Sequence, residues 1–222
     1  MTDVLATRID LFAPVASFRD PMFPGITRGL PVPPPSTLRG LLAAATGEVG
    51  YAPTLAVHAF VDGYGRDLET YHPIASDGTN PAIRGRVAAG KGGMTVRERD
   101  FLADVSVSLW VPGAEGERVG RAVRRPSWPL RLGRSQDVVH VVEVRKCRLR
   151  PTEQATVGHA LAPAGSHDRT DVIEIRLAER ISVDRERTRY GNYVWCQDDG
   201  VPVPTRDALI DDQGRAVWML PG

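Results

Sequence analysis

The stretch Pro33-Pro34-Pro35-Ser36-Thr37-Leu38-Arg39-Gly40-Leu41-Leu42 constrains the fold of this chain more than any other. Each proline restricts the residue before it to extended geometry, so no helix is expected before Ser36. The Ser36 hydroxyl is suited to accept hydrogen bonds from the first free backbone N–H groups of a helix. Thr46-Gly47 then offers a residue that favours the left-handed end of a helix. The sequence therefore predicts a helix from Ser36 to Thr46.

The predicted helix has an apolar face and a polar N-terminus. Apolar residues recur at i, i+3, i+4 and i+7, which is typical of a helix packed on a core, and these are Leu38, Leu41, Leu42 and Ala45. Ser36, Thr37 and Arg39 stand at its N-terminus, and a rigidly placed helix N-terminus suits an anionic group. A well-capped packing helix without any ligand is the simpler interpretation of the same residues.

The net charge of +1 hides an uneven distribution of charge along the chain. Residues 1–65 carry a net charge of −1, residues 66–150 carry +6 and residues 151–222 carry −4. Such an asymmetry favours a polyanionic partner for the middle region. Arginine provides 26 of the 28 basic residues. Guanidinium groups suit phosphates and stack on bases, although genomic base composition also raises arginine over lysine.

The hydrophobic pattern of the first 150 residues alternates between strand and helix. Alternation with a period of two predicts strands over residues 5–12, 54–61, 101–111 and 138–149. Helical periodicity predicts a second helix over 115–125. The resulting order β-α-β-β-α-β is that of the ferredoxin-like fold, which RNA-binding domains share. We therefore expect an α+β protein with a ferredoxin-like (RRM-like) module over 1–150 and a small β-rich region over 151–222.

Two segments of this module are irregular. Residues 13–35 form a long loop broken by proline and glycine, and loops of more than about 15 residues are often functional. Residues 62–98 contain many glycines and charges but few large apolar side chains. They predict a projecting finger, over about residues 66–98, inserted between the second and third strands.

Motifs for metal and phosphate chemistry are missing from the sequence. There is no GxxxxGK[ST], HExxH, CxxC or GxSxG pattern, and Cys147 and Cys196 lie far apart without ligand neighbours. We therefore expect no metal and no cofactor. No signal peptide and no membrane-spanning apolar run are visible, so we expect a cytoplasmic protein.

Three segments resemble the signature elements of a known family. Ala16-Ser17-Phe18-Arg19, together with the Pro33–Leu42 stretch, resembles the N-terminal signature of the CRISPR-associated protein family five. Arg99-Asp100-Phe101-Leu102-Ala103-Asp104 resembles the entry to the strand after the family's thumb. Leu130-Arg131-Leu132-Gly133-Arg134-Ser135-Gln136-Asp137 resembles its Leu-Gly-Arg-Ser-acid-Asp element, with Gln136 in place of the acid. The last element is most similar to the type I-B branch.

The resemblance implies a function and a set of partners. Members of this RAMP-superfamily family are subunits of type I Cascade, the antiviral surveillance complex, and bind the 5′ handle of crRNA. They cap one end of the backbone filament and contact the large subunit that reads target DNA, which leaves open a contact near the protospacer-adjacent motif. The finger would be the family's thumb, which presses on the RNA and displaces a base. The resemblance implies a non-catalytic role in most branches.

The expected RNA-binding residues come from four parts of the chain. The helix N-terminus and the long loop would grip handle phosphates, the segment before the fourth strand would line the same groove, and the finger would follow the RNA backbone. The predicted residues are Arg19, Arg28, Ser36, Thr37, Arg39, Arg84, Arg86, Lys91, Arg97, Arg131, Arg134 and Ser135.

Two alternatives remain open at this point. A metal-independent endoribonuclease that cuts repeat RNA, as in the type I-C branch, would need His or Tyr for proton transfer and Lys or Arg for charge stabilisation. Residues of these types are Tyr64, Tyr71, His72 and Lys91. A protein-docking assembly subunit with little RNA contact would instead use the acidic region 151–222 against basic partners.

Overall fold

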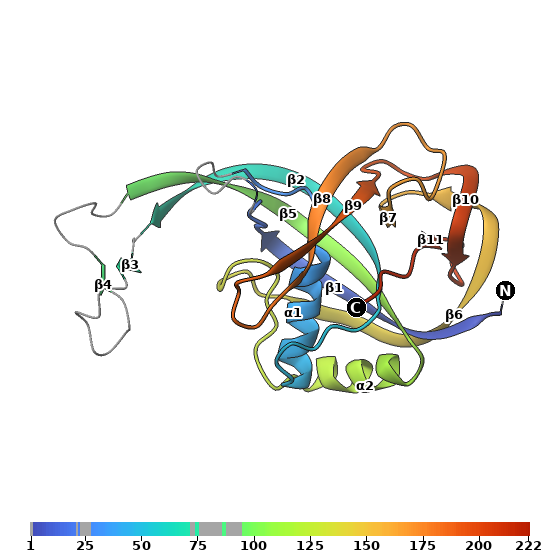
Figure 1. The fold of residues 1–222 in the computed structure, drawn as a ribbon, viewed down its shortest axis with the longest axis horizontal. Helices are drawn as coiled ribbons and strands as arrows, with labels where there is room; N and C mark the ends of the chain where they lie inside the picture. Colours follow the sequence, from blue (N-terminus) through green and yellow to red (C-terminus); the bar gives the residue numbers. More distant parts are fainter. Residues whose placement is uncertain (1, 21, 23–27, 72–73, 76–85, 88–94) are drawn as a thin grey trace.

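The computed structural model of the 222-residue chain describes residues 2–20, 22, 28–71, 74–75, 86–87 and 95–222 (Figure 1). The described part combines α and β structure, with two helices and mostly antiparallel sheet. No described helix is long and apolar enough to cross a membrane. The elements are β1 Val4–Ala16, α1 Pro35–Thr46, β2 Ala56–Tyr71, β3 Ile74–Ala75, β4 Arg86–Val87, β5 Thr95–Pro112, α2 Gly113–Arg124, β6 His140–Val157, β7 Leu161–Pro163, β8 Ile173–Ile181, β9 Thr188–Trp195, β10 Val201–Ile210 and β11 Ala216–Val217.

The largest sheet has the strand order β11-β10-β6-β1-β5-β2, and all its neighbouring strands are antiparallel. A smaller sheet has the order β7-β9-β8, and β3 pairs with β4. The first 150 residues thus contain the predicted succession strand, helix, strand, strand, helix, strand, with β3 and β4 between the second and third long strands. The two helices contact each other, and α2 packs on β1 (Figure 1).

The core is formed by the apolar faces of the strands and the apolar face of helix α1, which pack against each other. Ile9 and Leu11 of β1 are buried and lie opposite Leu109 and Val107 of β5. Leu38, Leu41, Leu42 and Ala45 of α1 are buried in the same cluster, so the predicted apolar face of this helix is confirmed.

Helix α1 begins one residue earlier than predicted. Its N-cap is Pro34 and its first residue is Pro35, and no side chain makes a cap hydrogen bond, so the prediction that Ser36 caps the helix is wrong. Proline suits this first position because its missing N–H would have no helical partner. The helix ends at Thr46 and is followed by the C-cap Gly47, whose φ of 74° is the left-handed conformation that the sequence predicted.

Two of the three glycines of helix α2 allow the helix to lie close to β1 and β5. A Cβ on Gly116 would stand 2.1 Å from the Val111 carbonyl oxygen, and one on Gly120 would stand 3.0 Å from the Thr7 side chain. This approach fixes the buried face of α2 and leaves Arg121 and Arg124 exposed on the other side.

Strand β6 passes through the predicted boundary near residue 150. Its first half pairs with β1, from Phe12–His140 to Val4–Leu149, and its second half pairs with β10. The division into 1–150 and 151–222 therefore falls inside a continuous strand. Residues 151–222 are rich in β structure, and the buried indole of Trp195 donates to the carbonyl of Ala59 at 3.0 Å, which ties β9 to β2.

Strands β2 and β5 pair along their whole length, from Ala56–Trp110 to Tyr71–Thr95, and project together from the rest of the molecule (Figure 1). The predicted strand 54–61 therefore ended ten residues too early. The base of the predicted finger 66–98 is part of this paired ribbon, which we call the β2–β5 ribbon.

Candidate functional site

Ser17 joins the three segments that carry the family resemblance. Its backbone N–H donates to Oδ2 of Asp137 at 3.1 Å, and its hydroxyl donates to the carbonyl oxygen of Asp100 at 2.7 Å. Ser17 is 4% exposed. The end of β1, the start of the core part of β5 and the turn before β6 therefore meet at one buried residue.

The turn before β6 is built around the buried carboxylate of Asp137. One of its oxygens accepts the backbone N–H of Arg134 at 2.9 Å, and the Arg134 guanidinium approaches the carboxylate at 3.1 to 3.2 Å. Gly133 has a φ of 110°, and a Cβ there would stand 2.5 Å from the Ser17 carbonyl oxygen. Only glycine fits this close approach between the two backbones.

A second carboxylate, that of Asp100, attaches the long loop to the β2–β5 ribbon. Its Oδ2 accepts the backbone N–H of Gly29 at 3.3 Å, and its Oδ1 accepts Nε of Arg66 at 3.0 Å. Arg66 also pairs with Glu98 at 3.0 Å. The loop folds back on itself through two backbone hydrogen bonds. The N–H of Asp20 donates to the carbonyl oxygen of Arg28 at 3.0 Å, and the N–H of Leu30 donates to that of Phe18 at 2.7 Å. This pairing brings the exposed residues Arg19 and Arg28 to the same end of the ribbon.

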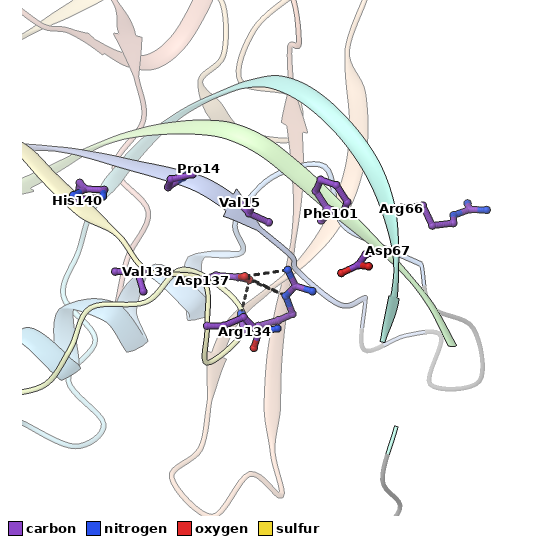
Figure 2. A pocket seen from close by; sticks show the side chains of 10 residues that line it. Pro14, Val15, Arg66, Asp67, Phe101, Arg134, Asp137, Val138 and His140 are labelled. Carbon is purple, nitrogen blue, oxygen red and sulfur yellow. Dashed lines mark hydrogen bonds and ion pairs between the residues drawn. The ribbon is translucent and has the colours of Figure 1, made fainter. Parts of the chain in front are cut away.

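Two pockets flank the base of the ribbon. The first has a volume of about 710 Å³ and is lined by Pro14, Val15, Arg66, Asp67, Phe101, Arg134, Gln136, Asp137, Val138 and His140 (Figure 2). The second has a volume of about 450 Å³ and is lined by Phe18, Gly29, Leu30, Pro31, Tyr64, Gly65, Arg66, Asp100, Phe101 and Leu102. Arg66 and Phe101 are shared by both pockets, so the two hollows meet at these residues.

Phe101 lies over a glycine in the neighbouring strand. It is paired with Gly65, and a Cβ on Gly65 would stand 2.3 Å from the Phe101 ring. The glycine therefore leaves room for the ring on the ribbon surface. Tyr64, which is 53% exposed and pairs with Leu102, points to the opposite face of the ribbon and lines the second pocket. The site thus combines aromatic rings with amide, carboxylate and guanidinium groups, which suits an unstacked base with phosphates at the rim.

Arg39 contradicts its predicted role at an anion site. It is 3% exposed, and its guanidinium donates to the carbonyl oxygens of Pro53 at 3.2 Å, Glu179 at 2.7 Å, Leu220 at 3.0 Å and Pro221 at 2.5 Å. Burial lowers its pKa. Arg39 therefore ties α1 to β8 and the C-terminal residues, and the prediction that it holds a phosphate is wrong.

The N-terminus of α1 lies apart from the two pockets. Ser36 lines a different hollow between α1 and the β8–β9 turn, together with Arg180 and Arg185. The backbone N–H of Thr37 donates to the Pro34 carbonyl oxygen at 2.9 Å. The predicted site residues of α1 are thus not brought together with those of the turn before β6.

The other predicted site residues divide into three groups. Arg134 lines the first pocket but is engaged with Asp137, while Arg131 and Ser135 are exposed on the same turn. Arg97 is exposed on β5 and lies opposite Glu69. Arg86 belongs to β4, and Arg84 and Lys91 fall outside the described residues, as does His72 of the endoribonuclease alternative.

The sequence did not predict an RNA-binding role for the residues that build the site, and Tyr64 was considered only for the endoribonuclease alternative. These residues are Ser17, Tyr64, Arg66, Asp100, Phe101 and Asp137. Four of them lie within the segments that carry the family resemblance, namely Ser17, Asp100, Phe101 and Asp137. The sequence signal for Asp137 was an acidic residue three positions after Gly133-Arg134, where its carboxylate can accept hydrogen bonds from the N–H groups of a turn. No group of three or more His, Cys, Asp or Glu side chains in the described ranges could hold a metal ion.

The comparisons with known proteins agree with the resemblance. The model of a family described as "CRISPR-associated protein (Cas_Cas5)" matches residues 8–193. The fold is similar to a chain of a "CRISPR RNA-guided surveillance complex", with a TM-score of 0.57, 21% identity, and coverage of 98% of this chain and 94% of that chain. It is also similar to "a CRISPR protein from Archaeoglobus fulgidus", with a TM-score of 0.52, 12% identity, and coverage of 97% and 99%. No curated protein matches the chain in sequence.

The family match defines the class of protein, which is a CRISPR-associated protein. Because the family model spans most of the sequence, the chain belongs to the Cas5 family of CRISPR-associated proteins. The family expected from the sequence is therefore confirmed.

Proposed function

We propose that this protein binds the 5′ handle of crRNA as a non-catalytic subunit of a type I surveillance complex. Family membership and the fold shared with a chain of an RNA-guided surveillance complex support this role. The order β6-β1-β5-β2, with α1 and α2 as the connecting helices, supports a ferredoxin-like, RRM-like module for residues 1–150.

The observation that carries the proposal is the pair of pockets at the base of the β2–β5 ribbon. Hydrogen bonds to the buried Asp137 and to the partly exposed Asp100 hold the walls of these pockets in place before any ligand arrives. A rigid site binds a flexible strand with less further ordering of the protein. Single-stranded RNA is recognised in this way, by stacking on aromatic rings and by hydrogen bonds to base edges.

Each part of the site has a chemical role in the proposal. Phe101 and Tyr64 stack on unpaired bases, and the Gln136 amide and the Asp67 carboxylate face base edges. The exposed guanidinium groups of Arg19, Arg28 and Arg131 bind phosphates at the rim.

The proposed partners follow from the family. The RNA enters the complex together with a backbone subunit and the large subunit, and the acidic region 151–222 (net −4) offers a face for basic surfaces of these subunits. A contact with target DNA near the protospacer-adjacent motif belongs to the same proposal, and so does a cytoplasmic location.

RNA affinity of single variants tests the site. Tyr64→Ala should weaken binding of handle RNA by about 5- to 160-fold, because loss of one base stack costs about 1–3 kcal/mol. Arg187→Ala, at an exposed arginine in the turn between β8 and β9, is the control and should leave affinity unchanged. Equal affinity of the Tyr64→Ala variant and the wild type would remove the stacking role.

The salt dependence of binding tests the electrostatic part. Neutralisation of about five phosphates gives a slope of about −3.5 for log affinity against log salt, at about −0.7 per contact for a single strand. A slope near zero would contradict the proposal.

Absence of catalysis is tested by incubating the purified protein with repeat RNA in EDTA. The proposal expects intact RNA. A discrete product that disappears in His72→Ala, Tyr71→Phe or His140→Ala would show that the protein is an endoribonuclease. His140 belongs in this set because it lines the first pocket.

A further inference from the structure

An exposed tryptophan stands in an arginine-rich segment that the proposed site does not use. Trp128 is 65% exposed, whereas Trp110, Trp195 and Trp218 are at most 2% exposed. No aspartate or glutamate occurs between residues 118 and 136, which contain six arginines. In this segment Arg121, Arg124, Arg125 and Arg131 are exposed.

The backbone that presents Trp128 is fixed. The N–H groups of Ser127 and Trp128 donate to the carbonyl oxygens of Ala45 and Ala44, each at 3.0 Å, at the C-terminal end of α1. Gly47 lies directly against Ser127, because a Cβ on Gly47 would stand 2.9 Å from the serine Oγ. The indole is therefore held out into solvent by an ordered turn and contributes little to the core.

The basic charges around Trp128 have few acidic partners. Arg118 pairs with Glu48 and Glu115, but no ion pair within the described part of the chain involves Arg125 or Arg131. Arg124 donates to the carbonyl oxygen of Val144, which leaves its positive charge uncompensated. A surface with this charge and one large aromatic ring matches a polyanion that carries bases.

The segment is continuous with the first pocket. The backbone of Arg131 forms an isolated β-bridge with that of Val138. Val138 lines the first pocket and is 58% exposed. Trp128 stands three residues before Arg131, a distance of at most about 10 Å along the chain. A strand that leaves the pocket over Arg131 therefore passes within about 10 Å of the Trp128 backbone.

We propose that Trp128 is a stacking platform for a base of the same single-stranded RNA, beyond the pockets at the base of the ribbon, with Arg125 and Arg131 on the flanking phosphates. This inference rests on the proposed function, because it takes the occupant to be the bound RNA. A protein partner is the less favoured occupant, because the run of arginines over residues 118–136 contains no acidic residue, and such a one-sided positive charge is typical of a surface that binds a polyanion.

Tryptophan fluorescence of the full chain tests the proposal, since Trp128 is the exposed indole among four tryptophans. The probe is a single-stranded RNA of about 20 nucleotides, long enough to cover a single-strand site of about 4–16 nucleotides with its flanks. RNA should quench the emission of the wild type and should leave that of Trp128→Phe nearly unchanged. Trp128→Ala should lower affinity by about 5- to 160-fold at an unchanged melting temperature. Leu5→Ala, at another exposed apolar residue (66%), should bind as the wild type does.

The charges are tested with Arg125→Gln, which should make the salt slope shallower by about 0.7.

The two proposals fail in different ways. If the wild type does not bind the RNA, the proposed function fails and this inference fails with it. If the wild type binds and Trp128→Ala binds equally well without quenching, only the inference is wrong. If Trp128→Ala binds RNA normally but no longer co-purifies with the other subunits, the surface docks protein and the inference is overturned.

Discussion

The backbone N–H of Ser17 donates to a buried carboxylate oxygen of Asp137, 3.1 Å away and 120 positions later in the chain. The same carboxylate accepts the N–H of Arg134 and pairs with its guanidinium. One side chain therefore holds the end of β1 and the turn before β6 in a fixed relation, and the first pocket lies between them (Figure 2).

Removal of the Asp137 charge should destabilise the protein. Asp137→Ala leaves the N–H groups of Ser17 and Arg134 without their acceptor and the guanidinium without its partner, and breaking a buried pair costs about 3–5 kcal/mol. For a chain of this size we expect the melting temperature to fall by about 6–20 °C in thermal unfolding. Arg131→Ala, at an exposed arginine of the same turn, should shift it by less than about 2 °C. Equal melting temperatures of Asp137→Ala and the wild type would contradict this role.

Gly133 and Gly40 give a matched pair of alanine substitutions. At Gly133 the φ of 110° and the Ser17 carbonyl oxygen, 2.5 Å from a Cβ, make alanine strained, so Gly133→Ala should cost about 1–3 kcal/mol. At Gly40, in the exposed part of α1, a Cβ meets nothing within 4 Å, so Gly40→Ala should stabilise by about 0.5–1 kcal/mol. Chemical denaturation of both variants checks the sign, and a stabilising Gly133→Ala would refute the close approach.

Arg39 should affect stability rather than RNA affinity. Arg39→Ala leaves four buried or half-buried carbonyl groups without their donor, so we expect a loss of about 3 kcal/mol or more. Arg180→Ala nearby, at an exposed arginine, should cost less than about 0.5 kcal/mol. At a temperature where Arg39→Lys is folded, its handle affinity should equal that of the wild type. A stable variant with weak RNA binding would restore the anion role.

His58 should make the protein less stable in acid. It lies edge-on against Trp110 and His159, with ring centroids 6.5 and 5.4 Å apart, and burial, helped by the charges of Arg215 and His159, lowers its pKa to about 3. An unfolded histidine has a pKa of about 6.5, so the unfolded state binds the proton more readily between these values. The stability is therefore fully present above pH ~6.5 and falls by about 3 kcal/mol towards pH 4.

Urea unfolding at several pH values measures this effect. His58→Gln should have a shallower loss of stability between about pH 6.5 and pH 4 than the wild type. His140→Gln, at an exposed histidine, is the control and should follow the wild type. Parallel curves for His58→Gln and the wild type would exclude His58 as the source.

Local patterns in the sequence were sufficient for the helices and for the order of the long strands. The proline run, the apolar spacing of α1 and Gly47 are all features of neighbouring residues, and each has the predicted consequence. The length of β2 was missed because Gly63 and Gly65 weaken a strand locally. In the structure Phe101, from the paired strand, covers Gly65 and continues the ribbon.

The candidate site could be predicted only in part, because its geometry depends on contacts between distant residues. Arg39 follows a helix N-terminus and resembles an anion ligand in sequence, but its acceptors lie up to 182 positions away. Asp137 and Asp100 are likewise defined by their distant partners. Arg19, Arg28 and Arg131 were proposed from residue type and position alone, and the structure shows that they are exposed.

Photo-crosslinking of 5′-handle RNA to the purified protein, followed by mass spectrometry, tests the central claim most directly. The account predicts crosslinks at Tyr64 and Phe101 and within residues 130–138, which line or adjoin the two pockets. Crosslinks confined to the N-terminus of α1 and the β8–β9 turn would contradict it and would place the RNA in the hollow beside Ser36.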